Sequence, residues 1–183
     1  KRQSSMIADL TGNMLDKGTT KNDKFALAGK LENMGASINY SVSTHKLTFT
    51  GKCLKKDLSN VIELIAEQLR YPGFDETELE KLKAQRAGSM KQLLENTNVR
   101  AEKKMNEMIF PKGHPNHEIS VAQLIEDIGK VEINDVKEFH KKYYGPQSMI
   151  FVLVGDVESD DVESAVKKYF DGWKGGKTYP KYD

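Results

Sequence analysis

The sequence has little of what identifies a metal cage, a membrane protein or a polyanion-binding protein. Its 183 residues include one cysteine, Cys53, which excludes an intrachain disulfide and a cysteine-rich zinc cage. The longest apolar run, Met149 to Val154, is far too short to cross a bilayer. Lys and Arg (28) nearly balance Asp and Glu (27), so the net charge of +1 creates no field that would attract nucleic acid. We therefore expect neither a nucleic-acid partner nor membrane insertion.

Apolar residues recur at helical spacing over much of the chain, and turn residues separate the periodic segments. Ser4-Ser5, Asp75 and Asn134 stand where side chains that cap helix N-termini are expected. The predicted helices cover about 4–17, 23–34, 56–70, 75–95, 99–109, 121–128, 134–144 and 160–170. This number of helices in one chain of domain size indicates a largely helical unit.

Three segments have the pattern of β-strands. Ser37 to Ser43 and Lys46 to Cys53 alternate apolar and polar residues around a short connection, which predicts a hairpin. Met149 to Val154 reads as a buried strand that ends at Gly155. The predicted fold class is α+β, a sheet with several helices packed on one face.

A series of short motifs follows one another along nearly the whole chain. They lie at 6–19, 31–37, 71–75, 114–115, 144–146, 154–157 and 170–173, beginning with Met-Ile-Ala-Asp-Leu-Thr-Gly-Asn-Met-Leu-Asp-Lys-Gly-Thr. In this order the motifs resemble the insulinase/pitrilysin (inverzincin) zinc metallopeptidase family, and the first resembles its active-site helix. The resemblance implies a metalloprotease-like (LuxS/MPP-type) unit that spans residues 1–183.

The zinc chemistry of that family is missing at the matching positions. An inverzincin helix presents two His at i and i+4, and a Glu beside the second His activates the attacking water. This chain has Asp9, Asn13 and Gly12 there, and the resemblance places the third ligand at Ser89. Leu82 falls where active relatives have a further Glu. We therefore expect no catalytic residue, no metal ligand and no cofactor in this chain, with zinc on a partner catalytic domain.

Gly12 has two explanations that the sequence alone leaves open. A glycine inside a helix costs about 1 kcal/mol against alanine. It indicates either close packing of a neighbour against the helix or simple release from the catalytic requirement.

The other candidate site residues have ordinary interpretations. His114 and His117 are close enough to suggest a metal site, but Pro115 disfavours helical spacing, so we interpret them as a solvated loop. His45 and His140 have no partner in the sequence and are expected at the surface. Cys53 has no activating neighbour and is interpreted as a small, partly buried apolar residue on a strand.

The resemblance implies a non-catalytic unit that forms part of the wall of a peptide-binding chamber. Its partners would be a catalytic peptidase domain, in the same chain or a second subunit, and the peptide substrate. Two alternatives stay open: an assembly module of a protease-derived complex without peptide handling, and an enzyme with a site around His114 and His117. Because units of this family open with strands before the active-site helix, we expect a fragment of a longer multidomain protein. Bacterial members are often exported, which makes the periplasm the compartment to consider.

Overall fold

The described part of the chain is mostly helical and contains a two-stranded sheet. The computed structural model describes residues 2–43, 46–93, 95–111, 114 and 119–177. In chain order its elements are α1 (Arg2–Asn13), α2 (Lys24–Asn33), β1 (Ser37–Val42), β2 (Leu47–Lys52), the 3-10 turn η1 (Lys55–Asp57), α3 (Leu58–Arg70), α4 (Glu76–Leu93), α5 (Thr97–Ile109), α6 (Val121–Gly129), α7 (Ile133–Tyr143), η2 (Pro146–Ser148) and α8 (Ser159–Phe170). None of the described helices is long and apolar enough to span a membrane.

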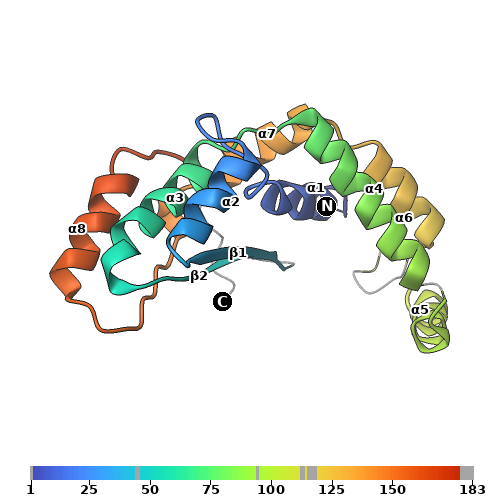
Figure 1. Cartoon of the computed structure of the whole chain (residues 1–183). Helices are drawn as coiled ribbons and strands as arrows, with labels where there is room; N and C mark the ends of the chain where they lie inside the picture. The colour runs from blue at the N-terminus through green and yellow to red at the C-terminus, as the bar shows by residue number, and fades with distance from the viewer. Residues whose placement is uncertain (1, 44–45, 94, 112–113, 115–118, 178–183) are drawn as a thin grey trace.

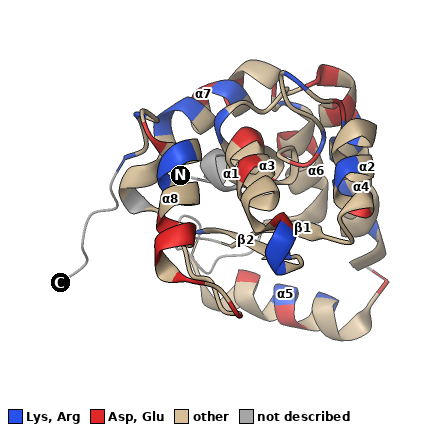
Figure 2. Ribbon diagram, turned by 60° about the vertical axis from the view of Figure 1, so that its left-hand side comes forward, with Lys and Arg blue, Asp and Glu red and all other residues tan. Residues whose placement is uncertain are grey.

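The elements form an arch (Figure 1). One end holds α2, α3 and α8, the other holds α4, α5 and α6, and α1 and α7 lie between them. Helix α1 packs against α7, β1 and α4 and so connects the two ends. Lys, Arg, Asp and Glu are distributed over most of the helices (Figure 2), in keeping with a net charge near zero.

All eight predicted helices are present, with differences at their ends. Asp75 caps α4 as predicted, because its Oδ1 accepts a hydrogen bond from the backbone N–H of Glu78 at 3.0 Å. Two predicted caps are wrong. Helix α1 begins at Arg2, before Ser4-Ser5, and the N-cap of α7 is Glu132, which forms a capping box with Asp135 in place of Asn134.

The predicted hairpin is confirmed. Strands β1 and β2 pair antiparallel with Tyr40 opposite Phe49, and the residues of β1 alternate between exposed and half-buried. Its connection at Thr44-His45 lies outside the described residues, and so does the expected surface position of His45. Cys53 directly follows β2 and packs against the core, where burial, together with the charge of Asp57, raises the pKa of its thiol.

The predicted third strand is wrong. Within the described residues, Met149 to Val154 pairs with no other strand. Met149, Phe151 and Leu153 are half-buried, whereas Ile150, Val152 and Val154 are 83%, 77% and 94% exposed. The segment has the alternation of a strand but no neighbour in a ladder, so its outer apolar face remains uncovered.

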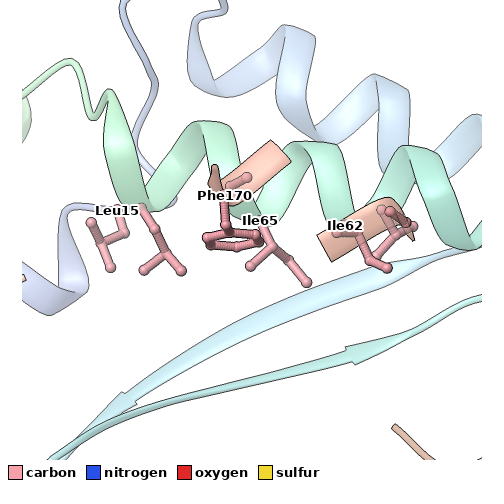
Figure 3. Packing of buried hydrophobic residues seen from close by; sticks show 8 residues of the cluster. Leu15, Ile62, Ile65 and Phe170 are labelled. Atoms are coloured by element: carbon pink, nitrogen blue, oxygen red, sulfur yellow. The ribbon is translucent and has the colours of Figure 1, made fainter. Parts of the chain in front are cut away.

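The core consists of two clusters that meet at α1. The first lies between α3, α8 and the hairpin, and in Figure 3 Ile62 and Ile65 point from α3 toward the strands, with Leu15 and Phe170 beside them. The second is built by α1, α4 and α7 and contains Leu10, Met14, Phe74, Leu79, Leu82, Val131 and Val136. Leu10 and Met14, in and directly after α1, belong to the second cluster, and the next residue, Leu15, belongs to the first, so the clusters meet at the end of α1.

Residues 18–19, shortly after α1, contact residues 72–73, shortly after α3, although the two motifs are far apart in the sequence. Thr19 forms an isolated bridge with Pro72, and the Gly73 N–H donates to the Gly18 carbonyl at 2.9 Å. The buried carboxylate of Glu67 accepts hydrogen bonds from the Thr19 hydroxyl and, at 2.7 Å, from Asn22 Nδ2. These bonds connect the segment that follows α1 to the end of α3.

An ion pair between α2 and α4 makes the stability of the chain depend on pH. Hydrogen bonds from Lys24 and then Lys81 lower the pKa of Glu78 from 4.5 to about 2. Because the folded pKa is depressed, ionised Glu78 stabilises the fold above pH 4.5, and its contribution is lost as pH falls toward 2.

We expect urea unfolding at a series of pH values to show this loss in the native chain and a weaker one in Glu78→Gln. Equal pH dependence in the two proteins would contradict the assignment.

Candidate functional site

Helix α1 places Asp9 and Asn13 on one side, one turn apart, where the resemblance puts the two zinc-binding histidines. Asn13 Nδ2 donates to the Asp9 carbonyl at 2.8 Å and to Asp9 Oδ1 at 3.0 Å. The amide group is therefore directed at the carboxylate, and the two side chains bind each other.

Arg86 of α4 occupies the remaining face of that carboxylate. Its Nε donates to Asp9 Oδ2 at 2.8 Å and its Nη2 donates to Asp9 Oδ1 at 3.0 Å. This two-pronged pairing is the strongest geometry for Arg and a carboxylate. The third-ligand position, Ser89, lies one turn further along α4, and Leu82 is buried in the core one turn before Arg86. A guanidinium cation thus lies next to the side chains at the family's metal-binding positions.

Sequence comparison by position did not identify Arg86. The resemblance places the third ligand at Ser89, three residues after Arg86 along the helix. Residues three apart share a helix face, so a cation at 86 could have been considered as a partner for Asp9.

The structure resolves the question about Gly12 in favour of close packing. A Cβ at this position would overlap with Val42 Cγ2 of β1 and lie 3.0 Å from Leu47 Cδ1 of β2. It would also lie 3.4 Å from the Tyr144 hydroxyl. The space that a water-activating glutamate would need at this point of α1 is filled by the hairpin.

These residues do not fit a zinc ion. One carboxylate, already bound by a guanidinium, with an amide and a hydroxyl lacks the imidazole or thiolate ligands that Zn²⁺ sites use. No group of three His, Cys, Asp or Glu side chains that could hold a metal occurs among the described residues. Gly12 also has no side chain that could act as a general base at the position where the resemblance places the water-activating glutamate.

Two histidines were also considered as site residues. His114 stacks on Phe110 with ring centroids 4.6 Å apart, while His117 lies outside the described residues.

The expected surface position of His140 is wrong. Its Nε2 lies 2.7 Å from the Leu69 carbonyl and its ring contacts Phe74 edge-on, and burial lowers the pKa of the imidazole.

A shallow depression lies beside the ion pair, along α4. Its volume is about 420 Å³. It is lined by Leu82, Gln85, Arg86, Gly88, Ser89 and Gln92. Among the described lining residues Arg86, which is paired with Asp9, is the one charged group, so this part of the depression is suited to neutral polar contacts.

Comparison with known proteins gives consistent results along the chain. The family profile described as Insulinase (Peptidase family M16) matches residues 4–119, and the profile described as Peptidase M16 inactive domain matches residues 130–183. The chain is 26% identical over 175 residues to the "Non-peptidase homolog YmxG" of Helicobacter pylori, with 94% of this chain and 40% of that protein covered. It is 26% identical over 166 residues to the bovine "Cytochrome b-c1 complex subunit 1, mitochondrial", with 87% of this chain and 33% of that protein covered.

A solved structure has a similar fold. The peptidase M16 inactive domain from Pseudomonas fluorescens superposes with a TM-score of 0.82 at 23% identity, covering 97% of this chain and 43% of that one. The chain thus spans less than half the length of these relatives.

The packing at Gly12 predicts an unusual response to alanine. Gly12→Ala should lower the free energy of unfolding by about 1–2 kcal/mol, because overpacking outweighs the gain in helix propensity. Gly12→Ala combined with Val42→Ala should recover part of the loss, because it removes the overlapping methyl group. Urea unfolding of these two variants and of Val42→Ala alone measures this. Greater stability of Gly12→Ala alone would show that the hairpin does not press on α1.

The Asp9–Arg86 pair predicts a measurable coupling. Both side chains are a little more than one-third exposed, so solvent weakens the pair, and we expect about 0.5–1 kcal/mol of interaction energy. A double-mutant cycle with Asp9→Asn and Arg86→Met gives this quantity from urea unfolding, and added salt should reduce it. Additive effects of the two substitutions would show that the Asp9–Arg86 ion pair contributes no interaction energy.

Proposed function

The chain belongs to the insulinase (peptidase M16) family, and we propose that it is a non-catalytic unit that forms part of the wall of a peptide-binding chamber. In this proposal the zinc is held by a catalytic domain elsewhere, in the same chain or in a second subunit. The parent protein or complex would be a zinc-dependent metalloendopeptidase.

One observation carries the proposal: the frame of the active-site helix is retained while the ligand positions are used for packing and pairing. Asp9 is bound by Arg86 and Asn13, and the position of Gly12 is closed by the hairpin. A protein that still used this site for hydrolysis would need these groups free to bind metal and water. Residues 130–183, which match the inactive-domain profile, support the same conclusion from the other end of the chain.

The length of the relatives supports an assembly of several units. This chain covers 40% of the Helicobacter pylori homologue and 43% of the Pseudomonas fluorescens structure. We propose that residues 1–183 are one unit of a longer multidomain protein.

A role in assembly without peptide handling is the second candidate. It is motivated by the similarity to a cytochrome b-c1 complex subunit, which by its name is part of a complex. The match of residues 130–183 to a domain described as a peptidase inactive domain favours the first proposal.

The zinc assignment is tested in the intact parent protein or complex. Replacement of Asp9 and Asn13 by alanine should leave the zinc content and the rate of casein cleavage at saturation unchanged. The reason is that, under the proposal, neither side chain touches the metal or the reacting bond. Zinc analysis by mass spectrometry and cleavage of carboxymethylated casein give both readouts. Loss of zinc in this variant would overturn the proposal, and a thermal melt controls for unfolding.

The two candidates differ in affinity for peptide. A chamber wall should make the assembly bind carboxymethylated casein more tightly than the separate catalytic unit does. Equal affinity of the two would favour a role in assembly alone.

A further inference from the structure

We propose that the depression on α4 is a docking site for the main chain of an extended polypeptide, centred on Gly88. This inference rests on the proposed chamber function and deepens it, because it assigns a surface of this chain to the contact. The contact is neutral and polar, and Gly88 controls how closely the polypeptide approaches.

The lining of the depression differs from the rest of α4. Gln85, Gly88, Ser89 and Gln92 are neutral, whereas the helix elsewhere carries Glu76, Glu78, Glu80, Lys81, Lys83 and Lys91. Side-chain amides and a hydroxyl both donate and accept hydrogen bonds, as a peptide main chain does. These four residues, which we call the polar row, are therefore complementary to the N–H and C=O groups of a peptide main chain. They do not favour a charged ligand over a neutral one.

Arg86 adds directed donors to this row. Its two bonds to Asp9 use Nε and Nη2, and a guanidinium has five N–H groups. Among the described residues no further partner of Nη1 is found, and Arg86 lines the depression. Since Asp9 balances the charge, the remaining N–H groups suit a carbonyl oxygen better than a free anion.

Gly88 has no role in packing within the described part of the chain. It is an exposed residue in the middle of α4, and a Cβ there would meet no atom within 4 Å. Glycine at such a position costs about 1 kcal/mol against alanine. The glycine leaves the helix backbone open to close approach from outside.

The length of the row fits a short stretch of extended chain. From Gln85 to Gln92 the helix rises about 10 Å, at about 1.5 Å per residue. Three residues of an extended strand cover about the same distance. A polypeptide lying along α4 could thus place successive polar groups against Gln85, Arg86 or Ser89, and Gln92.

The test compares two helix glycines in the intact parent protein or complex, with cleavage blocked by a chelator. Gly88→Leu fills the depression, and Gly29→Leu is the matched control on α2, where a Cβ also meets no atom within 4 Å. Leucine is the better helix former, so both variants should melt no lower than the native protein. The readout is the fluorescence anisotropy of labelled carboxymethylated casein.

We expect Gly88→Leu to weaken casein binding about tenfold, the effect of one or two lost hydrogen bonds, and Gly29→Leu to leave it unchanged. Gln92→Leu, an exposed substitution in the same row, should weaken it in the same direction. Undiminished binding by Gly88→Leu and Gln92→Leu overturns the docking site but leaves the chamber intact, because the assembly still binds casein. Equal weakening by Gly29→Leu also overturns it, and absence of binding by the native assembly overturns both proposals.

Discussion

The close approach of α1 to the β1–β2 hairpin is the constraint on which the arrangement around it depends. Helix α1 and the two residues that follow it contribute to both core clusters, and α1 contacts α7, β1 and α4, so its position sets how the two ends of the arch meet. Gly12 allows this position because the hairpin residues Val42 and Leu47 occupy the space of a side chain. On another side of α1, Arg86 binds Asp9 and connects the helix to α4. The contacts of Gly12 and Asp9 therefore also hold the fold together.

The Asp9–Arg86 pair connects two helices through opposite charges. In a metal site a cation attracts ligands from two helices, and here a guanidinium on one helix attracts a carboxylate on the other. The two kinds of connection differ greatly in energy. An ion pair that is about one-third exposed contributes about 1 kcal/mol or less, whereas a structural zinc ion contributes roughly 10 kcal/mol or more. The unit must accordingly rely on its apolar core, which α1, α3 and α4 supply.

Local patterns predicted most of the fold, and long-range contacts explain what they missed. Helical periodicity located every described α-helix, and alternation located the hairpin, because both signals are contained within one segment. Met149 to Val154 has the local pattern of a strand, but pairing requires a neighbour that the sequence of the segment does not specify. Arg86 and the half-buried position of His140 were missed for the same reason, since their partners Asp9 and Leu69 are distant in sequence. The sequence shows a glycine inside a helix at position 12, but the contact with Val42 that explains it depends on the hairpin, which is distant in sequence.

The uncovered strip of Ile150, Val152 and Val154 affects how a cell would handle this unit while it is alone. Extended apolar segments are features by which chaperones and proteases distinguish unfinished proteins from finished ones. A copy whose strip stays bare carries that signal even though its helices are folded, and covering the strip removes the signal.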